Sequence, residues 1–225
     1  MTLSQKVFLA IFTPFSKGFL SWEVKGRGNV PLTGPLIIVA NHVHLLDPIL
    51  LVFSFPRWIS FMAKEELFRS PFLRPIIHWG QAFPVYRRGT TKDKQKTLKQ
   101  AKELLDKGLV LGMFPEGKRS REGKLTRGKP GSAVMASRMG VSLLPVGIIG
   151  TDKFKGINWL WRRPHIIINI GQPFRLPSVD GKLNKSQMKL LTDSVMGKIA
   201  ALLPPEYQGA YFAGPKPAKR DEEFK

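Results

Sequence analysis

Short apolar runs alternate with amphipathic stretches along most of the chain. Residues 35–40 form a continuous run rich in branched side chains, which is typical of a strand buried on both faces. Asp47 and Pro48 then begin a second apolar stretch, and we expect Asp47 to be the N-cap of a helix and Pro48 its first residue. Further strands are predicted at 58–62, 82–86, 109–114, 143–149 and 165–170. This alternation predicts one α/β domain with a mixed, mostly parallel sheet flanked by helices.

Apolar residues at steps of three and four predict the helices between these strands. The most regular pattern covers 91–107 and ends before Gly108, a residue suited to the left-handed end of a helix. Other helices are predicted from Ser70-Pro71 onward, at 133–139 and around 188–202.

The first residues differ from the rest of the chain. Residues 7–20 are strongly apolar, but Pro14 and Lys17 interrupt them, and a membrane-spanning helix needs about 20 apolar residues. Phenylalanines at helical spacing beside lysines favour an element that lies on an anionic membrane surface, with a terminal helix packed on its own domain as the alternative. We expect a membrane-associated element at 1–22, one domain at 23–205 and a tail at 206–225.

Composition narrows the classes of function. The 225 residues include no cysteine, which excludes thiol catalysis, cysteine-based zinc sites and disulfides. Lysine and arginine number 36 against 16 aspartates and glutamates, so the net charge of +20 favours an anionic partner. Nucleic acid, an anionic membrane surface and an acidic substrate all fit that charge. The chain has no recognised nucleic-acid-binding motif, and we expect no nucleic-acid partner.

Polar residues gather where three predicted strands end. His42 follows the strand at 35–40, and Asp47 stands five residues later, where its carboxylate can orient the imidazole as a general base. Segments 114–120 and 80–88 lie at the ends of two other strands. Because the carboxyl ends of parallel strands meet at one edge of a sheet, we expect the three segments to converge.

A metal hydrolase is a competing interpretation of the same histidines. It would use His42, His44 and Asp47 as ligands, but Leu46 stands where the corresponding loop has an aspartate. We therefore expect no metal, and we expect His44, like His78 and His165, to lie in the core or behind the site.

Four segments, in order, resemble the blocks of the glycerolipid acyltransferases, and specifically the bacterial 1-acyl-glycerol-3-phosphate acyltransferases that make phosphatidic acid. Residues 41–47 (Asn-His-Val-His-Leu-Leu-Asp) are similar to the family's Asn-His-x4-Asp block, and 114–120 (Phe-Pro-Glu-Gly-Lys-Arg-Ser) to its Phe-Pro-Glu-Gly-Thr-Arg-Ser block. Residues 80–87 and 143–148 resemble the other two. The resemblance covers most of the chain.

The resemblance implies roles for single residues. His42 would be the general base and Asp47 its orienting partner. The acceptor glycerol phosphate would be bound by Arg87, Glu116, Gly117, Lys118, Arg119 and Ser120. For Glu116 two roles stay open: binding a glycerol hydroxyl or holding an arginine in place. No cofactor is implied, since acyl-CoA or acyl carrier protein supplies the acyl group as co-substrate. The enzyme would act at the cytoplasmic face of the cell membrane, as a peripheral or monotopic protein.

Two departures from the family pattern concern the acceptor. Lys118 stands where the family usually has threonine, and Tyr86 where an aspartate is common. Another lysophospholipid or a glycolipid is therefore the alternative acceptor. Residues 117–130, which we name the basic loop, hold six cationic side chains against one acid. A solvated face is the default interpretation of such a charge run, but here capture of phosphates on a substrate or membrane is favoured.

Overall fold

The structure, a computed structural model, describes residues 21–68, 82–85, 90–154, 163–179, 181 and 183–212. The expected apolar element at 7–20, the helix from Ser70-Pro71, and His78 lie outside the described residues. So do Tyr86, Arg87 and the chain after Phe212.

The described residues form a seven-stranded sheet in the order β1-β7-β6-β2-β5-β3-β4. All neighbouring strands are parallel except β6 and β7, which are antiparallel. The strands are β1 (Ser21–Lys25), β2 (Leu36–Ala40), β3 (Ile59–Lys64), β4 (Phe83–Val85), β5 (Val110–Met113), β6 (Ser142–Ile149) and β7 (His165–Ile170). The predicted mixed, mostly parallel sheet is confirmed.

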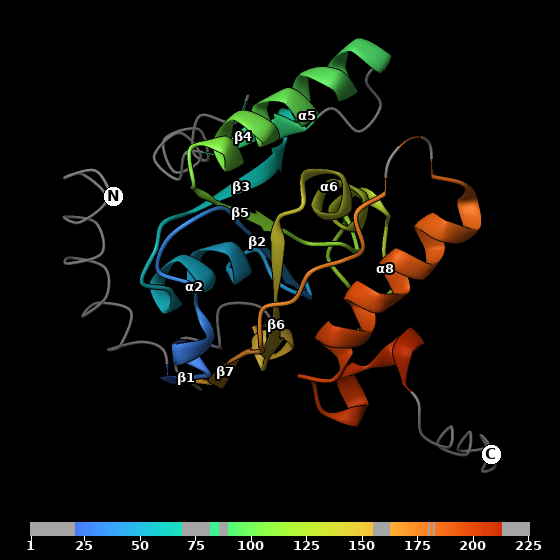
Figure 1. Cartoon of the computed structure of the whole chain (residues 1–225). Coiled ribbons are helices and arrows are strands. Elements are labelled where there is room, and N and C mark those ends of the chain that lie inside the picture. Colours follow the sequence, from blue (N-terminus) through green and yellow to red (C-terminus); the bar gives the residue numbers. More distant parts are fainter. Residues whose placement is uncertain are drawn as a thin grey trace.

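Helices cover both faces of the sheet (Figure 1). They are α2 (Asp47–Ser54), α3 (Glu65–Phe68), α5 (Thr91–Asp106), α6 (Gly131–Met139) and α8 (Lys185–Ala200). Capping boxes begin the two longest helices: Thr90 with Asp93 at α5, and Asn184 with Gln187 at α8. The described residues also form four short 3-10 helices: η1 (Arg27–Asn29), η2 (Thr151–Lys153), η3 (Pro205–Tyr207) and η4 (Gly209–Tyr211).

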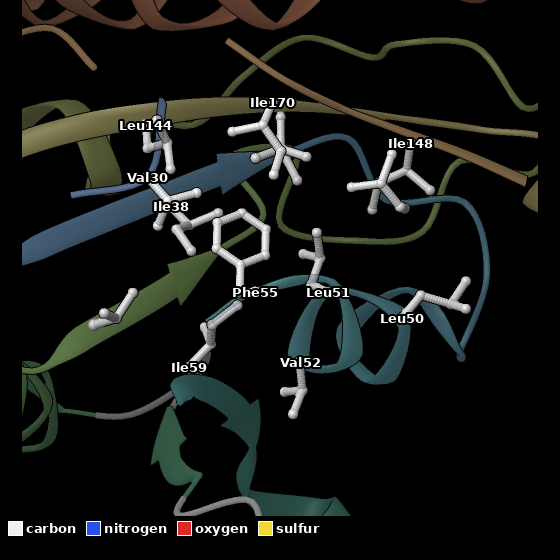
Figure 2. Close-up of a cluster of buried hydrophobic side chains, with 14 of the residues drawn as sticks. Val30, Ile38, Leu50, Leu51, Val52, Phe55, Ile59, Leu144, Ile148 and Ile170 are labelled. Carbon is white, nitrogen blue, oxygen red and sulfur yellow. The ribbon is translucent and has the colours of Figure 1, made fainter. Parts of the chain in front are cut away.

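The central strand β2 explains why its sequence is continuously apolar. All five of its side chains are buried, and they alternate between two hydrophobic clusters. Ile38 packs on one face with Leu51 and Phe55 of the α2 region (Figure 2). On the other face Ile37 packs with Ala101 of α5 and residues of α6 and α8. A strand sandwiched in this way has no solvent-facing position for a polar residue.

Three local expectations differ from the structure. The strand β1 was not predicted, because its five residues alternate between exposed and half-buried positions at the edge of the sheet. Asp47 is not the N-cap: α2 begins at Asp47 itself, after Leu46. His165 lies on the exposed start of β7, not in the core, and its Nδ1 is 3.1 Å from Ser21 Oγ. Among the described residues, no helix combines the length and apolar character needed to cross a bilayer.

Candidate active site

The expected convergence of strand ends occurs between β2 and β5. These strands are parallel neighbours, with Val39 opposite Met113, so the segments that follow them leave the sheet at the same edge. The backbone N–H of His42 donates to Glu116 Oε1 at 2.8 Å, across 74 residues of sequence. The third expected segment, at the end of β4, continues outside the described residues.

Asn41 fixes the direction in which the chain leaves β2. Its side chain donates to the carbonyl oxygen of Ile148 at 2.8 Å and accepts from the N–H of Ile148 at 2.7 Å. Both bonds are buried, and Ile148 lies on the neighbouring strand β6. The residue before His42 is thus held to the sheet by two hydrogen bonds.

His42 and Asp47 form a close pair. His42 Nδ1 lies 2.9 Å from Asp47 Oδ2, and the same oxygen accepts from the backbone N–H groups of Val43 (2.7 Å) and His44 (2.8 Å). The Asp47 side chain is fully buried, and Oδ1 has no hydrogen-bond partner among the described residues. A carboxylate accepts and cannot donate, so this pair places the imidazole proton on Nδ1 and leaves the Nε2 lone pair available.

Phe114 sets the plane of the imidazole. The two rings stack with centroids 4.1 Å apart and planes inclined by 20°, and Phe61 of β3 also stacks with Phe114, with centroids 5.7 Å apart. The His42 side chain keeps 17% exposure. Within the described part of the chain, Nε2 has no hydrogen-bond partner. The imidazole is therefore fixed on one edge and one face, and it can reach a substrate with the remaining edge.

Glu116 is enclosed by protein donors. Its Oε1 accepts from the His42 N–H, and its Oε2 accepts from both the N–H (2.8 Å) and the hydroxyl (2.7 Å) of Thr126. The residue is 2% exposed. Burial raises the pKa of its carboxyl, and the hydrogen bonds from His42 and Thr126 oppose that shift. Neither oxygen is bonded to an arginine among the described residues.

The other expected binding residues divide into two kinds. Gly117 has a φ of 69°, a left-handed conformation that favours glycine, and its N–H donates to Phe114. Ser120 is buried, and its N–H donates to the carbonyl oxygen of His42 at 2.7 Å. Lys118 and Arg119 are exposed and form no ion pair with other described residues. Lys118 and Arg119 are thus exposed cations that directly precede Ser120, the residue bonded to the His42 backbone.

The far end of the basic loop is anchored to the C-terminal 3-10 helices. The Leu125 N–H donates to the carbonyl of Tyr207, and the Leu125 carbonyl accepts from Ala210. The Gly128 N–H donates to the hydroxyl of Tyr211 at 3.0 Å. The backbone of the loop is therefore held while its cationic side chains remain exposed.

His44 lies next to the His42–Asp47 pair, and its backbone N–H donates to Asp47. Burial lowers the pKa of its imidazole, Asp47 raises it, and the charge of Arg119 lowers it. The His44 ring lies edge-on to Phe154, with centroids 5.0 Å apart. Nowhere in the described residues do three or more histidines, aspartates or glutamates gather so that they could hold a metal ion.

Sequence reasoning missed three residues that build this site: Asn41 as a link to β6, Phe114 as the ring under His42, and Thr126 as a partner of Glu116. Asn41 and Phe114 belong to segments that were singled out. Thr126 belongs to no motif, and no signal in the sequence points to it.

Comparison with known proteins shows which family the chain resembles. A family model described as Acyltransferase matches residues 21–149. A 1-acyl-sn-glycerol-3-phosphate acyltransferase of Borreliella burgdorferi is 33% identical over 58% of this chain and 52% of its own length. A lysophosphatidylcholine acyltransferase of Drosophila melanogaster is 31% identical over 64% of this chain and 26% of its own. The chain thus spans about half or less of these curated relatives.

A solved structure extends the likeness to the fold. The 1-acyl-sn-glycerophosphate (LPA) acyltransferase of Thermotoga maritima superposes with a TM-score of 0.63 and 29% identity, over 85% of this chain and 77% of that one. The family match contains β1 to β6 and both segments that meet at His42. On the strength of this match, which covers more than half of its residues, the chain belongs to the acyltransferase family.

Proposed function

We propose that the protein transfers a fatty acyl group from acyl-CoA or acyl carrier protein to the sn-2 hydroxyl of 1-acyl-glycerol-3-phosphate, which gives phosphatidic acid for phospholipid biosynthesis. The observation that carries the proposal is the His42–Asp47 pair, held at the sheet edge beside exposed cations of the basic loop. The names of the Borreliella and Thermotoga relatives support the same acceptor.

His42 acts as the general base in this proposal. Nε2 takes the proton of the acceptor hydroxyl while the oxygen attacks the thioester carbonyl, and collapse of the tetrahedral intermediate expels the thiolate. The imidazolium, stabilised by the buried Asp47 carboxylate, then returns the proton to the thiolate. The products are an ester and a free thiol, and no cofactor or metal takes part.

Cationic side chains bind the acceptor phosphate. Arg119 is the first choice, because guanidinium gives bidentate hydrogen bonds to phosphate, and Lys118 adds a second positive charge. The resemblance also assigns Arg87 to this role. Gly117 and Ser120 contribute backbone geometry, through the left-handed turn and the bond to the His42 carbonyl.

The reaction takes place at a membrane surface, since the acceptor is a lipid. The charge of +20 suits an anionic leaflet, and the basic loop supplies exposed cations. We propose peripheral or monotopic attachment at the cytoplasmic face of the cell membrane, with the part of the expected element at 1–22 that precedes β1 as the attachment.

The acceptor is tested with a panel of lysophospholipids. Purified protein is incubated with each lipid and with acyl-CoA or acyl carrier protein, and the products are identified by mass spectrometry. Phosphatidic acid from 1-acyl-glycerol-3-phosphate, with little product from the other lipids, is the expected result. Absence of any acylated lipid with either donor would contradict the proposal.

A second acceptor class is supported by two observations. Lys118 replaces the threonine usual in the family, and a relative is named a lysophosphatidylcholine acyltransferase. In this alternative the mechanism at His42 is unchanged and the headgroup differs. Phosphatidylcholine or another diacyl lipid as the main product of the panel would favour it.

A further inference from the structure

We propose that Glu116 and Thr126 together form a positioning unit that holds the backbone of the general base, so that Glu116 acts through His42 and does not bind the acceptor. The inference rests on the proposed role of His42 and deepens it. It assigns to Thr126 a function that no motif indicates. For Glu116 it replaces the two roles left open by the sequence, binding a glycerol hydroxyl or holding an arginine, with a third: holding the backbone of His42.

The hydrogen bonds of Glu116 carry the argument. Three protein donors, from His42 and Thr126, occupy its two oxygens at 2.7–2.8 Å. With 2% exposure, the carboxylate is closed to a substrate hydroxyl unless these bonds break. Breaking them would leave a buried charge and two partly buried N–H groups without partners, which is unfavourable.

The segment after β5, to which Glu116 belongs, holds His42 by both of its backbone polar groups. The N–H donates to Glu116, and the C=O accepts from Ser120 four residues further on. Asn41 fixes the preceding residue on β6. The backbone at His42 is therefore hydrogen-bonded on two sides: through Asn41 to β6, and directly to the segment after β5.

Thr126 connects Glu116 to the far end of the basic loop by two hydrogen bonds. Its hydroxyl and N–H reach Glu116 from ten residues away in the sequence, and the neighbouring Leu125 is held by Tyr207 and Ala210. The backbone that carries the cations is thus hydrogen-bonded, through one carboxylate, to the backbone that carries the base. We infer that this bond keeps a phosphate bound by the loop at a constant distance from Nε2.

Removal of the Thr126 hydroxyl tests the unit with little change in shape. In Thr126→Val the carboxylate loses one of three donors, and we expect kcat to fall about tenfold with little change in the acceptor KM. Thr126→Ser keeps a hydroxyl and is expected to restore kcat to within about twofold of wild type.

Amide hydrogen exchange gives a second readout that needs no activity. The His42 N–H is expected to exchange about tenfold faster in Thr126→Val and in Glu116→Gln, because its acceptor is displaced. Thr97→Val is the matched control. It removes a half-buried hydroxyl that donates to the Asp93 carbonyl within α5, and it should leave both kcat and His42 exchange at wild-type values.

The outcomes separate this inference from the proposed function. Equal kcat and equal His42 exchange in Thr126→Val and Thr97→Val would overturn the positioning unit. A raised acceptor KM in Glu116→Gln with unchanged His42 exchange would also overturn it, since that result is expected of a substrate ligand. If wild type acylates no lipid, the proposed function fails, and the exchange rates still decide whether Glu116 and Thr126 hold His42.

Discussion

The turn that carries His42 and the basic loop beside it are built differently. In the turn, polar groups are bonded within the protein: Asp47 Oδ2 has three partners and the His42 backbone has two. In the basic loop the backbone is anchored, but Lys118 and Arg119 remain exposed and without ion pairs among the described residues. A general base needs a fixed position and tautomer, whereas cations that bind a substrate must be free to meet it. On the basis of this difference we propose that the turn carries the chemical step and that the loop binds the acceptor.

Loss of the His42 imidazole from the turn should give the largest fall in kcat. In His42→Ala we expect kcat to fall by about 10³-fold or more, because the Nε2 atom that takes the hydroxyl proton is lost. The fold should remain, since the side chain of His42 packs at the edge of the core. Initial rates and circular dichroism on the same sample measure both properties. A variant that keeps more than about a tenth of wild-type kcat would remove His42 from the mechanism.

Asp47→Asn should reduce kcat by about 10²-fold or more. The amide can still accept from Val43 and His44, but it no longer supplies the negative charge that fixes the Nδ1 proton and stabilises imidazolium. The acceptor KM should change little. Asp193→Asn is the control: this exposed residue pairs with Lys189 on α8, and its loss should not alter kcat. A large change in KM with normal kcat would contradict the orienting role.

The basic loop should respond in the opposite way. In Arg119→Ala we expect the KM for the acceptor to rise about tenfold while kcat changes less, because a charge-assisted bond to phosphate is lost. Lys153→Ala, which removes a cation outside the loop, is the comparison variant. A fall in kcat with an unchanged KM would show that Arg119 serves the chemical step. That result would contradict the division between chemistry at the turn and acceptor binding at the loop.

His44 offers the smallest effect and concerns stability. Burial lowers the pKa of its imidazole in the folded protein, so below about pH 6.5 the unfolded chain binds a proton that the folded chain resists. The contribution of His44 to the free energy of unfolding is therefore present above that pH and declines as the pH falls. His44→Gln should lose less stability than wild type between pH 7.5 and 5.5, as measured by urea unfolding. Identical pH slopes for the two proteins would contradict this.

Much of the fold follows from the sequence because its strongest patterns are local. The continuous apolar run of β2 marks a central strand, and Gly108 marks the end of α5 with a φ of 70°. In the edge strand β1 exposed and half-buried residues alternate, and this partial burial of one face leaves only a weak pattern in the sequence. Local patterns therefore identify the centre of the sheet better than its edge.

The candidate site is only partly predictable for a different reason. The His42–Asp47 pair is five residues apart, and a turn after a strand brings the two side chains together whatever the rest of the chain does. The partners of Glu116 depend on how β2, β5 and the basic loop meet in space. The Asp47 carboxylate likewise accepts hydrogen bonds from three donors of the turn and does not cap α2. The Asp-Pro pattern fits either arrangement and so does not predict which one forms.

Direct transfer of the acyl group to the lipid hydroxyl, with His42 as base, can be tested by following the fate of the acyl group. Rapid-quench mass spectrometry would follow both the protein and the lipid after wild type is mixed with acyl-CoA or acylated carrier protein, with and without 1-acyl-glycerol-3-phosphate. The account predicts unmodified protein throughout, and phosphatidic acid with free thiol only when the acceptor is present. Acylated protein and a burst of thiol in the absence of acceptor would contradict it.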